Sequence, residues 1–167
     1  IESVYGDDTQ PLILSPTREL AKQISEEIRN ASDKEVVTIY GGVSYKPQIK
    51  GAETSSIGVG TPGRVLDLLK KGHLEVDTLN YFVLDEADRM LDMGFQDELE
   101  SIISFLPDER QNLLFGATIP SDLKKMCDRY NIDPEVIRIT ESEHTRNLDE
   151  KYVNAQRDEK VSMLYSL

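Results

Sequence analysis

The chain has 167 residues, of which 38% are hydrophobic and 30% are charged, and its formal net charge is −12. No apolar run approaches the ~20 residues that a membrane-spanning helix needs, and a single cysteine, Cys127, excludes an internal disulfide. The excess of acidic residues argues against a broad basic face of the kind that binds nucleic acid.

Short apolar runs predict six strands, at 11–14, 36–40, 57–59, 81–84, 112–115 and 136–139. Helix-like segments lie between most of them, at 18–29, 62–71, 97–105 and 121–130. Leu20, Ile24 and Ile28 give the first helix an apolar stripe, and Pro62 after Thr61 suits a helix start behind an N-cap hydroxyl. This alternation predicts an α/β fold with a mostly parallel sheet, helices on both faces and ligands at the carboxyl ends of the strands.

The most informative segment is the octet at 81–88, which reads Tyr-Phe-Val-Leu-Asp-Glu-Ala-Asp. Asp85, Glu86 and Asp88 arrive where a buried strand would end, and adjacent buried carboxylates need a cation or donors to offset their desolvation. Magnesium prefers oxygen ligands and keeps several waters, so the octet indicates metal-assisted phosphate chemistry. The alternative is an acid-rich helix start that complements the helix dipole.

Four other predicted strands are also followed by polar or glycine-rich residues. In chain order these are Pro16, Thr17, Arg18 and Glu19; Gly41 and Gly42; Thr61, Pro62, Gly63 and Arg64; and Gly116, Ala117 and Thr118. Two of the segments pair a hydroxyl with an arginine at the mouth of a helix, an arrangement that suits a phosphate. Each segment alone could be a helix start or a turn, but five in order are hard to explain as turns.

These five blocks resemble, in sequence and order, the first RecA-like lobe of a DEAD-box RNA helicase, from about residue 11 to the C-terminus. The resemblance implies an ATP-dependent RNA helicase that couples Mg-ATP hydrolysis to RNA binding and to local duplex unwinding or RNP remodelling. It implies that Asp85 and Glu86 belong to the nucleotide-binding site, that Asp85 holds Mg²⁺ through water, and that Glu86 orients or deprotonates the attacking water. Asp88 would link this site to Gly116, Ala117 and Thr118, as part of the catalytic set.

The resemblance also implies partners. One RNA strand would be held by its sugar–phosphate backbone, independently of sequence, as phosphate contacts carry no sequence information. The residues implied are Pro16, Thr17, Arg18, Glu19, Gly41, Gly42, Thr61, Pro62, Gly63 and Arg64. A second helicase lobe in cis and protein cofactors are further expected partners, and no membrane is expected.

Two departures from the family concern what the chain lacks. No Gly-x-x-x-x-Gly-Lys-Ser/Thr loop occurs in the sequence, and we expect most of the second lobe to lie beyond Leu167. We therefore expect a fragment that is inactive alone, since the phosphate loop and the arginines of the other lobe are needed for hydrolysis. Its expected parts are a partial first lobe at 1–140, an interdomain linker at 141–150, and the start of the second lobe at 151–167.

A third departure is at position 116, where the family usually has serine. The glycine found here lacks the hydroxyl, so we expect less efficient unwinding. Three alternatives remain: a signal-receiver or phosphatase domain, a DNA translocase of the wider helicase superfamily, and a helicase-like scaffold without ATPase activity. Because of the net charge, RNA binding by this lobe alone should be weak. The single cysteine fits an intracellular protein, with cytoplasm and nucleus not distinguished.

Overall fold

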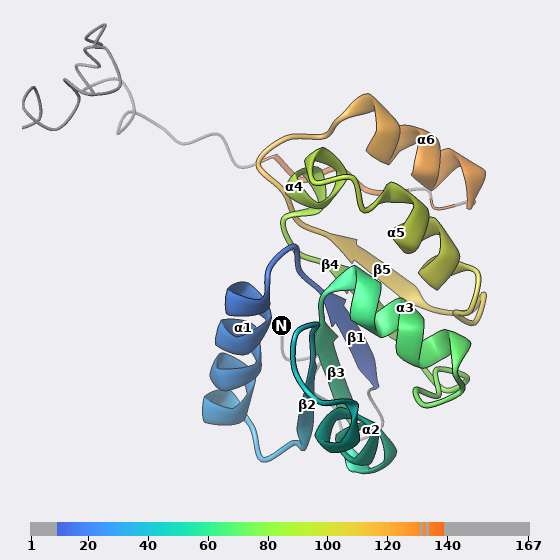
Figure 1. The fold of residues 1–167 in the computed structure, drawn as a ribbon. Helices are drawn as coiled ribbons and strands as arrows, with labels where there is room; N and C mark the ends of the chain where they lie inside the picture. The colour runs from blue at the N-terminus through green and yellow to red at the C-terminus, as the bar shows by residue number, and fades with distance from the viewer. Residues whose placement is uncertain (1–9, 131, 133, 139–167) are drawn as a thin grey trace, which may run out of the picture. The chain divides into compact units, whose positions relative to one another are not determined.

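The computed structural model describes residues 10–130, 132 and 134–138. The chain divides into two units between Pro134 and Glu135, and every described helix and strand belongs to the first unit. The elements are β1 (Pro11–Leu14), α1 (Arg18–Ala31), β2 (Val36–Ile39), α2 (Tyr45–Thr54), β3 (Ile57–Gly60), α3 (Pro62–Lys70), β4 (Tyr81–Leu84), α4 (Ala87–Asp92), α5 (Gln96–Ile103), β5 (Gln111–Leu114) and α6 (Ser121–Arg129) (Figure 1).

The five strands form one parallel sheet in the order β2-β3-β1-β4-β5, with β1 at its centre. All four residues of β1 are buried, as expected of a parallel strand that is covered on both faces. The last residues of the strands pair in register: Ile39 with Gly60, Gly60 with Leu14, Leu14 with Leu84, and Leu84 with Leu114. All five strands therefore end on one edge of the sheet.

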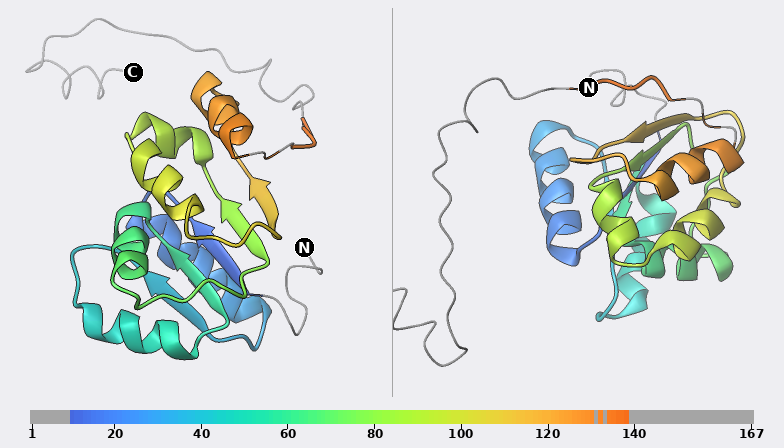
Figure 2. Two further views of the ribbon diagram at one scale, coloured as in Figure 1. Left: turned by 90° about the vertical axis from the view of Figure 1, so that its right-hand side faces the viewer. Right: turned by 90° about the horizontal axis from the view of Figure 1, so that it is seen from above.

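Helices cover both faces of this sheet, but unequally (Figures 1 and 2). On one face Leu12, Leu14, Phe82 and Leu84 pack in a cluster with residues of α3, α5 and α6. On the other face Ile13, Val59 and Val83 pack in a second cluster that includes Ala21 and Ile28 of α1. The three-layer α/β arrangement predicted from the sequence is thereby confirmed.

Two helices were not predicted. Helix α2 contains Pro47 and Gly51, and Gln48 is its one buried residue, so the sequence has no apolar stripe. The proline is tolerated because it lies in the first turn, where the backbone N–H has no helical acceptor. Helix α4 has only six residues, too few for a periodic pattern. Both helices nevertheless carry or position residues of the site.

The predicted strand at 136–139 is wrong for the residues that the structure describes. No strand is assigned at 134–138, and Val136 and Ile137 are 55% and 81% exposed. An apolar run becomes a strand only where a neighbouring strand completes its backbone hydrogen bonds, and no ladder among the described residues includes this run. The linker predicted at 141–150 and the second-lobe start predicted at 151–167 lie outside the described residues. Among the described helices, none is long and apolar enough to cross a bilayer.

Candidate active site at the carboxyl edge of the sheet

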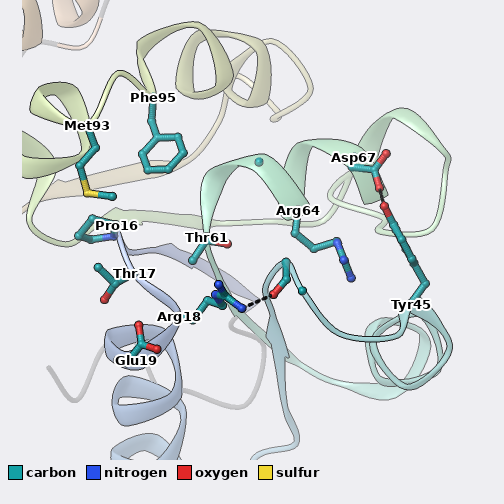
Figure 3. Close-up of a pocket in the computed structure, with 13 residues that line it drawn as sticks. Pro16, Thr17, Arg18, Glu19, Tyr45, Thr61, Arg64, Asp67, Met93 and Phe95 are labelled. Atoms are coloured by element: carbon teal, nitrogen blue, oxygen red, sulfur yellow. Dashed lines mark hydrogen bonds between the residues drawn. The ribbon is translucent and has the colours of Figure 1, made fainter.

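The in-register strand ends bring the five predicted blocks to one edge, where they form two regions. The first, which we call the polar groove, is lined by Pro16, Thr17, Arg18, Glu19, Gly41, Gly42, Tyr45, Thr61, Gly63, Arg64, Asp67, Met93 and Phe95, and has a volume of about 600 Å³ (Figure 3). The second, the acidic edge, consists of Asp85, Glu86 and Asp88 with the loop 116–118. Of the residues predicted to bind RNA, only Pro62 does not line the groove, because it is buried in the first turn of α3.

Arg18 is held at the groove by the glycine pair after β2. Its Nη1 donates a hydrogen bond of 3.2 Å to the carbonyl oxygen of Gly41. Gly42 has a φ of +83°, and a Cβ added there would overlap the Arg18 guanidinium. Thr17 caps α1 by accepting a hydrogen bond from the Leu20 amide at 3.2 Å. The turn therefore requires glycine at position 42 for its backbone angle and for the arginine beside it.

Arg64 is anchored from several sides. Its Nη1 and Nη2 both donate to the carbonyl oxygen of Val43 at 3.2 Å, and Nη1 lies 3.4 Å from Oε1 of Gln48. The guanidinium carbon lies 3.9 Å from the centroid of the Tyr45 ring. These acceptors are neutral, so they fix the direction of the arginine without cancelling its charge.

Gln48 is the residue that holds this part of the groove together. It is only 5% exposed, and its Oε1 accepts from the amide of Tyr40 at 3.2 Å while its Nε2 donates to the Tyr40 carbonyl at 3.1 Å. One side chain thus pairs both backbone groups at the start of the loop that presents Gly41 and Gly42. Because the same Oε1 faces Arg64, Gln48 ties two of the predicted blocks to each other.

A carboxylate also lines the groove, but its charge is balanced. Asp67 forms an ion pair of 2.9 Å with Lys71 and accepts a hydrogen bond from the Tyr45 hydroxyl. The hydrogen bond from Lys71, followed by that from Tyr45, lowers the pKa of Asp67, and the same Asp67 contact raises the pKa of Lys71. Lys71 is thus the main partner of Asp67, and the nearby charge of Arg64 makes a smaller contribution to the lowered pKa of Asp67.

Thr61 is the N-cap residue of α3, as predicted, and Pro62 is in the first turn. The Thr61 hydroxyl, however, makes no capping hydrogen bond, although the sequence predicted an N-cap hydroxyl here. The hydroxyl therefore lines the groove together with Thr17 (Figure 3). The two arginines and two hydroxyls suit the oxygens of a phosphodiester backbone.

The acidic edge begins with a strained turn. The Asp85 amide donates to the Leu14 carbonyl at 2.9 Å, and the Ala87 amide donates to the Phe115 carbonyl at 2.8 Å. Between these two anchors Glu86 has φ 52° and ψ 49°, and it is the one non-glycine residue with positive φ in the described part of the chain. Left-handed backbone costs of order 1 kcal/mol for such a residue and is often found at functional sites.

Asp85 carries an electrostatic cost that a cation would reduce. Burial, together with the charge of neighbouring Glu86, raises the pKa of Asp85, although the Glu86 amide opposes this by donating a hydrogen bond of 3.1 Å. The described residues contain no cluster of three His, Cys, Asp or Glu side chains that could hold a metal ion. One or two carboxylates are what Mg²⁺ uses when water and substrate phosphates supply its other ligands, so Asp85 fits that ion.

Asp88 connects the acidic edge to the loop after β5. Its Oδ2 accepts from the Thr118 amide at 2.8 Å and from the Thr118 hydroxyl at 2.9 Å. Burial favours the neutral acid, but these hydrogen bonds outweigh it and lower the pKa of Asp88. A Cβ added at Gly116 would lie 3.0 Å from Asp88 Oδ1. Thr118 therefore makes the contact to Asp88, while Gly116 lies against the other oxygen and Ala117 is exposed.

With this geometry established, comparison with known proteins gives a single answer. A family model described as "DEAD/DEAH box helicase" matches residues 2–126, three quarters of the chain. The chain belongs to the DEAD/DEAH box helicase family.

Several members of this family resemble the chain closely. It is 42% identical over 170 residues to the ATP-dependent RNA helicase DbpA of Bacillus subtilis, covering 98% of the chain and 36% of that protein. It is 43% identical over 167 residues to the ATP-dependent RNA helicase CshA of Listeria monocytogenes, covering 97% of the chain and 32% of that protein. The chain thus spans about a third of the length of these helicases.

A solved structure of the same family supports the fold. The crystal structure of a DEAD box protein from Methanococcus jannaschii superposes with a TM-score of 0.76 at 35% sequence identity, covering 96% of this chain and 44% of that one. The RecA-like architecture implied by the sequence resemblance is therefore confirmed.

Sequence reasoning missed five residues that build the groove of this DEAD/DEAH box lobe: Tyr45, Gln48, Asp67, Met93 and Phe95. Tyr45 and Gln48 lie on the unpredicted helix α2, and their polar side chains gave no periodic signal. The available signal was proximity in sequence, because both follow the glycine pair within seven residues. Met93 and Phe95 lie in the continuation of the acidic block, which is part of the family resemblance, but no role at the site was predicted for them.

Proposed function

We propose that this chain is the RNA-binding and catalytic part of the first lobe of an ATP-dependent RNA helicase. The observation that supports it is the register of the sheet, which places the polar groove and the acidic edge side by side on one edge. An enzyme that converts ATP hydrolysis into movement of RNA can couple the two sites directly when both lie on one sheet edge. The names of the relatives, which are ATP-dependent RNA helicases, support the same conclusion.

In this proposal the polar groove holds one RNA strand by its backbone. Arg18 and Arg64 face the phosphates, and the hydroxyls of Thr17 and Thr61 donate to phosphate oxygens. Gly41 and Gly42 allow a close approach of the strand, while Pro16, Glu19, Pro62 and Gly63 shape the helix starts. Contacts to phosphates carry no sequence information, so binding that uses these groups on the backbone is independent of sequence.

The acidic edge carries the hydrolysis. Bound Mg-ATP would supply the phosphoryl group and the charge of Mg²⁺. Asp85 is the residue that would hold the Mg²⁺ ion. Glu86 has a carboxylate at the end of a rigid turn, where it can orient a water molecule and accept its proton. Asp88 fixes the loop 116–118 through Thr118, so that a shift of the acidic edge is transmitted to that loop.

The proposal extends to parts of the protein outside the described residues. We propose that 1–140 is part of the first lobe, that 141–150 is a linker, and that 151–167 begins a second lobe that closes on ATP and RNA. Without a phosphate loop in its sequence, the chain alone should be inactive. The single cysteine is consistent with an intracellular location.

The decisive experiment is the substitution Glu86→Gln in the full-length protein. The RNA-stimulated ATPase rate should fall by a factor of about 100 or more, because the glutamine amide cannot accept a proton from water. The affinity for RNA should be unchanged. Glu109→Gln, at an exposed carboxylate in the turn before β5, is the matched control and should leave the rate unchanged. A rate that RNA does not stimulate would contradict the proposal, and equal stimulation by single-stranded DNA would favour a DNA translocase.

A further inference from the structure

Helix α3 carries a carboxylate, Asp67, that has two cations within reach along one face of the helix. Arg64 precedes it by three residues and Lys71 follows it by four, and both spacings place side chains next to each other. Asp67 pairs with the lysine, whose Nζ lies 2.9 Å from Oδ1 and 3.0 Å from Oδ2. Arg64 instead donates both of its terminal nitrogens to the carbonyl oxygen of Val43 at 3.2 Å. The two cations of α3 therefore have different partners.

The side chain of Tyr45 stabilises this choice of partners. Its hydroxyl donates to Asp67, and Lys71 Nζ lies 3.5 Å from that hydroxyl and 4.5 Å from the ring centroid. The same ring carries the Arg64 guanidinium at 3.9 Å from its centroid (Figure 3). The hydrogen bonds from Lys71 and Tyr45 are the main causes of the lowered pKa of Asp67, and the charge of Arg64 adds to them. Arg64 is thus close enough to attract Asp67 even while it faces another acceptor.

Lys71 differs from its neighbours in its position relative to the groove. Asp67, Arg64 and Tyr45 line the groove, whereas Lys71 does not, and its side chain is 49% exposed. Loss of the lysine charge would leave Asp67 with Arg64 as the other cation on its helix face. A carboxylate can accept two charge-assisted hydrogen bonds from a guanidinium, and these are stronger than those to the neutral carbonyl of Val43. The carboxylate would then draw the arginine away from its direction in the groove.

We infer that Lys71 is a positioning residue for RNA binding: by occupying Asp67 it keeps the Arg64 guanidinium available to a phosphate in the groove. The inference rests on the proposed RNA-binding function. It adds that a lysine without a contact to RNA controls whether an arginine makes one. A modification that removes the charge of Lys71, such as acetylation, would weaken RNA binding for the same reason.

The test is a double-substitution cycle in the full-length protein, measured by fluorescence anisotropy with a single-stranded RNA. Lys71→Met removes the charge and keeps the apolar stem, so binding should weaken roughly threefold, in the range of exposed ion pairs. Adding Asp67→Asn to this variant should restore the affinity to that of Asp67→Asn alone, because no carboxylate then competes for Arg64. Lys70→Met, at the exposed neighbouring position, is the matched control and should bind like the unsubstituted protein.

Two binding results would overturn the inference. A loss that persists in the double variant, together with a salt slope that stays reduced by ~0.7, would mean that Lys71 itself contacts a phosphate. Equal affinities of Lys71→Met and the unsubstituted protein would show that Asp67 does not compete for Arg64.

A second readout does not depend on RNA. In a crystal structure of the Lys71→Met variant, the Arg64 guanidinium should lie on Asp67 instead of on the Val43 carbonyl. An arginine that keeps its hydrogen bonds to Val43 would contradict the inference and leave the proposed function intact. If the unsubstituted protein binds no RNA even at low salt, the proposed function is contradicted, whereas the predicted shift of Arg64 is still decided by the crystal structure.

Discussion

The polar groove and the acidic edge lie on the same edge of the sheet but are built in opposite ways. In the groove, Arg18 and Arg64 are held by neutral carbonyl oxygens, so their positions are fixed and their charge is kept. At the acidic edge, Asp85 and Glu86 lie next to each other on a left-handed turn, and the pKa of Asp85 is raised by burial and then by Glu86. The groove is preorganised by the fold alone, whereas the edge carries a cost that a bound cation would offset.

The strongest test of this comparison is to remove Gln48, the side chain that preorganises the groove. Gln48→Leu leaves both backbone groups of Tyr40 without their partner, so the free energy of unfolding should fall by about 2 kcal/mol. RNA affinity should fall as well, because Arg64 and the glycine loop lose their common support. Denaturant unfolding and anisotropy measure the two effects. Gln23→Leu, at an exposed site on α1, is the control, and equal effects of both substitutions would contradict the role of Gln48.

Adjacent glycines allow a sharper version of the same test. Gly42→Ala introduces a side chain at φ +83° and against Arg18, so it should cost about 1–2 kcal/mol of stability and displace the guanidinium. Gly41→Ala meets no atom within 4 Å and has no positive φ, so it should change stability little. The ratio of RNA affinities of the two variants reports the position of Arg18. If the two alanines behave alike, the turn does not need glycine at position 42.

The loop after β5 tests how the acidic edge is connected. Thr118 already donates to one oxygen of Asp88, and Gly116 lies beside the other, so Gly116→Ser should add a donor to Asp88. In the full-length protein we expect roughly twofold more unwinding per ATP hydrolysed. This change is small in free energy, because even a tenfold change corresponds to only ~1.4 kcal/mol. Gly116→Ala supplies the Cβ without the hydroxyl and is the control. Unchanged unwinding per ATP in the serine variant would dispose of this idea.

The smallest expected effect concerns Asp85. Its folded-state pKa is raised, so its ionisation costs stability once the pH exceeds the unfolded-state value near 3.8, and the full cost is reached above the folded-state pKa. Asp85→Asn should therefore stabilise the fold slightly at pH 7, and the gain should vanish well below pH 3.8. Thermal unfolding as a function of pH measures the difference. A gain that persists at low pH would show that ionisation is not its cause.

The sequence was sufficient where one principle decided the outcome. Apolar runs followed by polar blocks located β1 to β5, and the parallel sheet then required the blocks to share an edge. It was insufficient where tertiary contacts decide. The structural role of Gln48 is visible only when the Tyr40 backbone is seen beside it. Residues 136–138 have the composition of a strand, but they have no ladder partner among the described residues.

The contact between Thr118 and Asp88 shows the same limit at the site itself. The resemblance linked Asp88 to the loop 116–118 as a whole, and glycine at position 116 suggested that this link was weakened. The structure places the Thr118 hydroxyl and amide on Asp88, so the link is made by a residue two positions further along. Which of two neighbouring side chains reaches a carboxylate depends on the backbone path of the loop, and composition does not determine that path.

Helix α4 has a consequence for how the two regions communicate. It begins directly after Glu86 and ends at the turn that carries Met93, and its six residues span only ~9 Å. A rod this short does not bend, so a tilt at its carboxylate end must swing the opposite end by a comparable amount. If a change at Glu86 tilts this helix, Met93 moves with it, so the acidic edge and the groove are connected through six residues.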